Sequence, residues 1–319
     1  MEIQEINRSM KLGNTLIEKG QKWQGELKVT DHYSMPIYGI CGEEEGKTLV
    51  ITAGVHGCEY VGVQTARKLW KSLNPREMKG QVILLPLVNQ CGFYEGAKQI
   101  VPEDGENLNR VFPGKSDGTL TQRIAYVIEK EVYPHADFLI DLHGGDCNEA
   151  MEPLVFFPVA AKSLVNEISR EAASYLPVTY RVSSTAKNGL YSYATQKGIP
   201  ALLLEIGGEG KWQESEVEHC ENCIYHLMSY LNILQTNVSK KEQKEIIQAV
   251  YDEAGVNGFW YPRVKPGQSV SKGDLLGKIC DLEGNDLQQY IAQLDGEVLY
   301  HTTALGIKKG DPLIAYGAY

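Results

Sequence analysis

The stretch Thr48-Leu-Val-Ile-Thr-Ala-Gly-Val-His-Gly-Cys-Glu59 joins an apolar run to the beginning of a helical pattern. Residues 48–53 are mostly apolar, which predicts a strand buried on both faces, and residues 61–73 have the apolar spacing of a helix. The same alternation continues along the chain. We expect further buried strands at residues 81–88, 138–142 and 201–206, and further helices at residues 119–132, 164–175 and 214–234.

Short apolar strands separated by helices indicate a sheet that helices cover on both faces and that contains much parallel pairing. Residues 26–29 and 37–40 are expected to add antiparallel strands to it. The sequence therefore predicts an α/β fold with a mixed, largely parallel sheet flanked by helices.

The character of the chain changes near residue 236. Residues 235–244 are polar, and glycines recur after them at short intervals with little helical spacing. We therefore expect a catalytic domain over residues 1–236 and a smaller all-β domain over residues 237–319. Residues 264–277 resemble the hammerhead of biotinyl and lipoyl carrier domains, but residues 293–296, at the corresponding hairpin, hold no lysine to modify. This resemblance concerns the fold only.

Composition excludes several classes of protein. The formal net charge is −10, so an acidic surface would repel nucleic acid, and no apolar run is long enough to cross a membrane. The first five residues have neither the basic start nor the apolar core of a secretory signal. We expect a soluble, cytoplasmic protein that binds neither nucleic acid nor membranes; a homo-oligomer stays open.

The seven cysteines are odd in number and irregularly spaced, which argues against a disulfide framework. Cys220 and Cys223 have the spacing of a redox or zinc motif. They fall, however, on the apolar positions of the helix expected at residues 214–234, so we interpret them as buried core residues.

Two strand ends carry candidate metal ligands. His56 and Glu59 are three residues apart just beyond the strand expected at 48–53, so both side chains can face one point. His143 ends the run Phe138-Leu-Ile-Asp-Leu-His143 and is followed by two glycines. Strand ends of a parallel sheet meet at one edge, where ligands bind.

His56, Glu59 and His143 form a set of two imidazoles and one carboxylate, which suits zinc with a fourth position open for water. Asp141, two residues before His143, is a candidate to orient one of the ligands. The sequence shows no second ligand cluster, so we expect one zinc ion per chain. The alternative for His56 and Glu59 is a surface histidine beside a carboxylate that a helix N-terminus favours.

Glu205 closes the apolar run Ala201-Leu-Leu-Leu-Glu205, where a charged side chain is costly unless it has a partner. Beside a metal and its water, Glu205 could move protons as a general base and acid. A structural salt bridge is the other explanation. Asn109 and Arg110 precede a Pro-Gly turn, and an arginine fork beside an amide suits a substrate carboxylate, although a salt bridge within the loop would explain the pair equally well.

Four segments resemble, in their order and spacing, the motifs of the succinylglutamate desuccinylase/aspartoacylase family, a branch of the zinc carboxypeptidase superfamily. They are GVHGCE, DGENLNRVFPG, DLHGG and LEIGGEG. The resemblance covers about residues 25–235, and the tail also looks like the family's C-terminal domain. It implies that the two histidines and Glu59 hold zinc, that Glu205 is the general base, and that Asn109 and Arg110 grip a substrate carboxylate.

The resemblance also marks one departure. Family members use an arginine upstream of the Asn-Arg pair to polarise the scissile carbonyl, and residues 96–102 contain none. Lys98 could substitute, but its ammonium lacks the forked geometry. Tyr191 and Tyr193 match positions that line the pocket in relatives.

The function expected is zinc-dependent removal of an acyl group from a small N-acylated amino acid or a related amide that carries a carboxylate. A carboxypeptidase acting on short peptides would use the same residues. A non-catalytic zinc-binding scaffold is the alternative of another class, and the complete ligand set together with Glu205 counts against it.

Overall fold

The computed structural model describes residues 9–13 and 15–319. The first five residues, on which the expectation of no secretory signal rests, lie outside this range. No helix in these ranges is long and apolar enough to cross a membrane.

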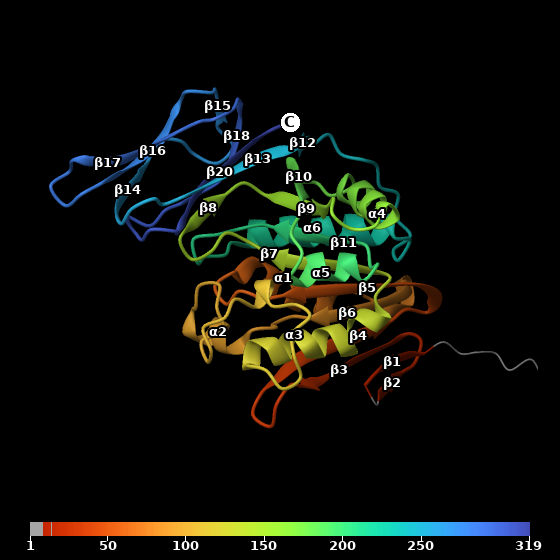
Figure 1. The fold of residues 1–319 in the computed structure, drawn as a ribbon. Coiled ribbons are helices and arrows are strands. Elements are labelled where there is room, and N and C mark those ends of the chain that lie inside the picture. The colour runs from red at the N-terminus through yellow and green to blue at the C-terminus, as the bar shows by residue number, and fades with distance from the viewer. Residues whose placement is uncertain (1–8, 14) are drawn as a thin grey trace, which may run out of the picture.

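A nine-stranded sheet forms the centre of the larger part of the molecule, and helices pack on both of its faces (Figure 1). The strand order is β12-β10-β9-β11-β7-β5-β6-β4-β3. At its centre lie β6 (Lys79–Leu85), β5 (Glu44–Ala53), β7 (Phe138–His143) and β11 (Ala201–Glu205), which are all parallel. β7 is buried throughout and β5 over residues 48–53, as expected for apolar strands covered on both faces.

The outer strands make the sheet mixed. They are β3 (Gln21–Lys28), β4 (Ser34–Cys41), β9 (Leu154–Pro158), β10 (Tyr180–Ser184) and β12 (Lys244–Ile246). The pairs β3–β4, β4–β6 and β9–β11 are antiparallel, whereas β10 is parallel to both of its neighbours. The predicted fold class is confirmed, and β9, β10 and β12 are additions that the sequence pattern did not reveal.

Two apolar cores lie on opposite faces of the sheet. One is covered by α1 (Tyr60–Ser72), α4 (Ser163–Ala173) and α6 (Glu214–Tyr230), and the other by α3 (Leu120–Glu131) and α5 (Leu190–Gln196). Cys220 and Cys223 are buried in the first core, which confirms their interpretation as core residues. The remaining elements of this part are β1 (Met10–Leu12), β2 (Thr15–Ile17), α2 (Gln90–Glu95) and the 3-10 turns η1 (Pro75–Glu77), η2 (Leu108–Arg110) and η3 (Tyr133–His135).

The C-terminal part consists of two antiparallel sheets. One contains β13 (Gln248–Glu253), β20 (Pro312–Ala318), β18 (Gly296–Thr302) and β15 (Ser269–Val270); the other contains β17 (Asp286–Ile291), β16 (Leu275–Cys280), β14 (Gly258–Pro262) and β19 (Gly306–Ile307). An all-β C-terminal region is thus confirmed.

Two strands connect the two parts. β12 follows the predicted boundary at residue 236 yet pairs with β10 at the edge of the large sheet. β8 (Glu149–Met151), from the larger part, pairs with β18 of the C-terminal part. The division of the chain at residues 236 and 237 stays a prediction.

Candidate metal centre

The candidate ligands meet because two neighbouring parallel strands end at the same edge of the sheet. His143 is the last residue of β7, His56 follows β5, and Glu59 stands at the N-cap of α1. Gly54 lets the chain turn sharply after β5, because its φ of +67° is one that other residues rarely adopt. The local sequence thus places three buried polar side chains beyond the strand ends.

Glu59 holds the two imidazoles together. Its Oε1 lies 2.7 Å from Nδ1 of His56, and its Oε2 lies 2.8 Å from Nδ1 of His143. The three ligand atoms all lie within 4.8 Å of one another. Both histidines therefore turn the same ring nitrogen toward one buried carboxylate.

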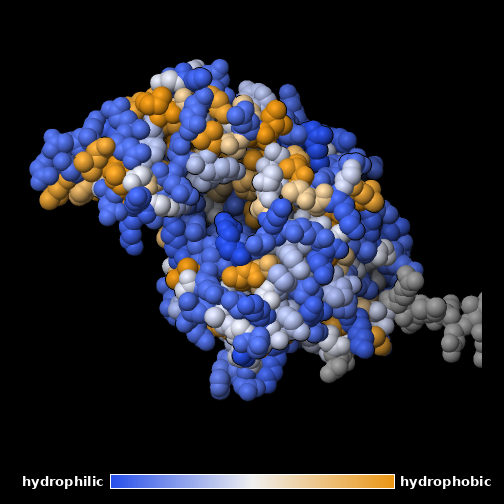
Figure 2. Space-filling model, in the orientation of Figure 1, coloured by the Kyte–Doolittle hydropathy of each residue, from blue (hydrophilic) through white to orange (hydrophobic). Residues whose placement is uncertain are grey.

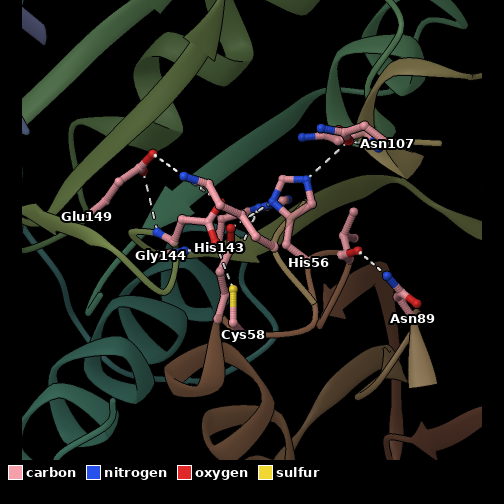
Figure 3. A network of polar contacts seen from close by, with 12 residues as sticks. His56, Cys58, Asn89, Asn107, His143, Gly144 and Glu149 are labelled. Atoms are coloured by element: carbon pink, nitrogen blue, oxygen red, sulfur yellow. Dashed lines mark hydrogen bonds and ion pairs between the residues drawn. The ribbon is translucent and has the colours of Figure 1, made fainter. Parts of the chain in front are cut away.

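The other nitrogen of each ring is anchored from outside. Nε2 of His56 lies 3.2 Å from Oδ1 of Asn107 (Figure 3). Nε2 of His143 lies 3.1 Å from Oδ2 of Asp141. Asp141 in turn accepts a hydrogen bond of 2.6 Å from the hydroxyl of Thr52. When each Nε2–H donates outward, each Nδ1 lone pair is free for a metal, which is how proteins orient metal-binding histidines.

Charge supports the same interpretation. Burial alone would raise the pKa of Glu59, but the charges of His56 and His143 outweigh it and lower this pKa to about 2. Burial lowers the pKa of His143, but Asp141 and Glu59 raise it well above its usual value. A buried carboxylate that demands positive charge, flanked by two nitrogen donors, fits a divalent cation, and the mixture of nitrogen and oxygen donors suits zinc.

Glu205 lies beside this set. It ends β11 in register with His143 on the neighbouring strand. Its Oε2 is buried and, among the described residues, has no hydrogen-bond partner. Burial, and next the charges of Glu59 and Glu149, raise the pKa of Glu205 well above its usual value against the opposing charge of His143. Glu205 is therefore a candidate for proton transfer beside the candidate ligands.

Asn109 and Arg110 are adjacent in sequence but differ in burial and in their contacts. Asn109 is buried, and its Oδ1 accepts the backbone N–H of Leu190 at 2.9 Å, which fixes the beginning of α5. Arg110 is exposed, and its Nη1 donates to the backbone oxygen of Asn109 at 2.8 Å. The guanidinium is thus presented toward solvent on a loop that Asn109 secures.

The two tyrosines differ in their surroundings. Tyr191 is buried, and burial together with the charges of Glu205 and Asp141 raises its pKa, so it lies within reach of the centre's charges. Tyr193 packs among Phe112 and Tyr133, with ring centroids 6.5 Å away in both cases. Tyr193 therefore contributes to an aromatic cluster of the core.

Lys98 extends toward the loop after His143. Its Nζ donates to Oδ1 of Asn148 at 2.6 Å and lies 3.8 Å from Oδ2 of Asp146 and 3.8 Å from Oε1 of Glu149. Glu149 and Asn107 flank the two histidines on opposite sides (Figure 3). Asn107 and Glu149 were missed by the sequence analysis, because nothing in their local pattern distinguishes them from ordinary loop residues.

A second group of ligand-type side chains lies close by. The Sγ atoms of Cys58 and Cys147 and a carboxylate oxygen of Asp146 all lie within 4.8 Å of one another. The expectation that the chain holds no second ligand cluster is therefore wrong. Residues 58 and 147 are far apart in sequence, and only the convergence of the two strand ends brings them together.

Comparison with known proteins agrees with this geometry. The family model described as the succinylglutamate desuccinylase/aspartoacylase catalytic domain matches residues 45–231. The chain belongs to this family. The matched segment contains the three candidate ligands, Glu205 and the Asn-Arg pair, and the resemblance inferred from the motifs is confirmed.

Similar proteins also match most of the chain, including residues beyond 231. The N-alpha-acetyl-L-2,4-diaminobutyric acid deacetylase of Halomonas elongata is 24% identical over 287 residues, covering 84% of this chain and 81% of that protein. The product-bound structure of the ectoine utilization protein EutE (DoeB) from Ruegeria pomeroyi superposes with a TM-score of 0.85 at 23% identity, over 93% of this chain and 95% of that one. A succinylglutamate desuccinylase/aspartoacylase structure from Rhodobacter sphaeroides gives a TM-score of 0.84 at 23% identity over the same shares. The fold, including its C-terminal part, is thus shared with both structures.

We predict about one zinc ion per chain, held by His56, Glu59 and His143. Replacing both histidines by alanine should abolish zinc retention, because a single carboxylate cannot hold the ion. Elemental analysis of dialysed protein measures this, and Cys58→Ser with Cys147→Ser is the matched control, expected to retain one zinc. Stoichiometric zinc in the double-alanine variant would contradict the assignment.

Asn107→Leu should weaken zinc binding by about ten- to a hundredfold, because His56 loses the acceptor that orients its ring. Competition with a chromophoric chelator gives the dissociation constant. Asn107→Asp keeps an acceptor oxygen and is expected to retain tight binding. Equal affinity in wild type and Asn107→Leu would show that the contact to Nε2 does not orient the ligand.

Proposed function

We propose that this protein is a zinc-dependent deacylase that hydrolyses the amide bond of a small N-acylated amino acid or a related carboxylate-bearing amide. One observation carries the proposal: two imidazoles share the Glu59 carboxylate, and Glu205, in register with His143, holds a buried Oε2 with no hydrogen-bond partner among the described residues. Membership of the aspartoacylase family and the deacetylase name of the Halomonas relative support it.

The residues divide the work as follows. Zinc held by His56, Glu59 and His143 would supply a Lewis acid that polarises water and the scissile carbonyl. Glu205 takes a proton from the attacking water and delivers it to the departing nitrogen. Its buried, unpartnered oxygen supports this role, because burial raises its affinity for a proton.

Two positively charged side chains, Arg110 and Lys98, are proposed to contact the substrate. Arg110, exposed on a loop that Asn109 fixes, can present two parallel donors to a substrate carboxylate. Lys98 lies near Glu149 and would donate to the oxygen of the substrate carbonyl as that oxygen gains negative charge. Tyr191 lines the pocket near Glu205, while Tyr193 supports it through the aromatic cluster.

The proposal includes a small substrate. The face shown in Figure 2 is hollowed between the C-terminal sheets and the larger part, and β8 joins the two parts beside that hollow. We expect the C-terminal part to narrow access for a long peptide, and for this reason we propose deacylation rather than carboxypeptidase activity. A non-catalytic scaffold would give no reason for a carboxylate whose buried Oε2 has no hydrogen-bond partner in the described part of the chain.

Glu205→Gln keeps the shape of the side chain and removes the base. Zinc should remain bound while kcat falls about a hundredfold or more, as expected when a general base is lost. Zinc content and turnover of N-acetyl amino acids are measured on the same preparation. Loss of zinc from a folded Glu205→Gln protein would mean that Glu205 is a ligand.

Arg110→Ala should mainly raise KM, because the guanidinium binds the carboxylate equally in ground and transition state. The loss of a charge-assisted contact is worth about 1.5–3 kcal/mol, or about ten- to a hundredfold in kcat/KM. Arg110→Lys should recover only part of this, since an ammonium lacks the fork.

The matched comparison uses a free-acid substrate and its methyl ester with both wild type and Arg110→Ala. Wild type should prefer the free acid, and the variant should lose that preference. If wild type hydrolyses acid and ester equally well, carboxylate recognition by Arg110 is wrong.

A further inference from the structure

Lys98 is held by an amide rather than by a carboxylate. Its Nζ makes a hydrogen bond of 2.6 Å to Oδ1 of Asn148, whereas Asp146 and Glu149 each lie at 3.8 Å, beyond hydrogen-bond distance. The two carboxylates attract the ammonium without occupying its N–H groups. An ammonium has three donors, so those not directed at Asn148 remain available to a ligand.

The two acidic side chains are more deeply buried than the side chain of Lys98. The side chains of Asp146 and Glu149 are 1% and 12% exposed, whereas that of Lys98 is 32% exposed. The acidic groups therefore form a floor, and the ammonium lies on its open side. Cys58, the residue before Glu59, donates its thiol to Oδ1 of Asp146 at 2.8 Å, which places this floor next to the metal centre.

Asn148 is itself fixed by the C-terminal part. Its backbone oxygen accepts a hydrogen bond of 2.9 Å from Oγ1 of Thr302 and another of 2.7 Å from the backbone N–H of Thr303. The next residue, Glu149, begins β8 and pairs with Thr302. Thr302 is almost fully buried, and its own oxygen accepts Nε1–H of Trp260 at 3.1 Å.

We infer that Asn148 is a positioning residue through which the C-terminal part fixes the ammonium of Lys98 beside the metal centre. Two connected contacts make the relay: Thr302 holds the backbone of Asn148, and the side chain of Asn148 holds Lys98. The consequence for turnover rests on the function proposed above, in which Lys98 donates to the substrate carbonyl. The positioning of Lys98 by Asn148 does not depend on that function.

Chemical labelling tests the positioning without turnover. Brief treatment with an amine-reactive acyl reagent, followed by peptide mass spectrometry, gives the relative labelling rate of Lys98. We expect this rate to rise several-fold in Asn148→Ala, which removes the acceptor of the ammonium, and to rise by a smaller factor in Thr302→Val, which removes one of the two hydrogen bonds that hold the backbone of Asn148. Thr303→Val is the matched control, since its side chain is exposed and its backbone contact to Asn148 is retained.

Kinetics on the zinc-loaded protein test the consequence. Asn148→Ala should lower kcat/KM by about tenfold with most of the loss in kcat, because a misdirected donor fails chiefly in the transition state. The same change in a Lys98→Ala background should have little further effect, since two residues that act through one contact are not additive. If Asn148→Ala lowered kcat/KM only by disturbing the structure, its effect would add to the effect of Lys98→Ala.

The outcomes separate the two ideas. Labelling of Lys98 that stays at the wild-type rate in Asn148→Ala overturns the positioning inference, whatever the activity. If Lys98 is labelled at the same rate in Thr302→Val as in Thr303→Val, the C-terminal part does not fix Lys98 through Thr302, and that step of the inference is overturned. Increased labelling with a kinetically silent Lys98→Ala upholds the positioning and instead removes Lys98 from the proposed function.

Discussion

The arrangement of this site depends on one buried carboxylate that two imidazoles share. Glu59 cannot stand buried without positive charge around it, and His56 and His143 supply that charge on either side. The ring positions follow from this contact, because each outer nitrogen must then find an acceptor. Asn107 and Asp141 meet that need, and Thr52 extends the chain of hydrogen bonds into the strand before His56.

The two acceptors differ in charge, and this makes the centre asymmetric. A neutral amide orients His56, whereas a carboxylate orients His143. A carboxylate raises the basicity of the ring it contacts more than an amide does. In the proposed centre, His143 is thus expected to be the more basic ligand of the two, and it is also the one in register with Glu205.

Sequence and structure agree where periodicity and strand ends decide the outcome. Residues 48–53 and 138–142 could be recognised as buried strands because nearly every side chain is apolar, and the histidines after them follow from the rule that ligands gather at strand ends. The sequence could not reveal β9, β10 and β12, whose patterns are short and whose pairing depends on distant partners. Asn107, Glu149 and the meeting of Cys58 with Cys147 were missed for the same reason: their roles arise from long-range contacts, which no local spacing encodes.

The pairing of β8 with β18 has a consequence for how the protein is made. Met151 pairs with Tyr300, so nearly half of the chain separates the two partners. A contact of such high sequence separation carries a large loop-closure cost and forms late. During synthesis, β5 and β7, at whose ends His56 and His143 lie, are complete long before residue 302 leaves the ribosome. The candidate ligands can therefore assemble first, and we expect the segment that carries Asn148 and Glu149 to acquire its final form only when the last strands of the chain arrive.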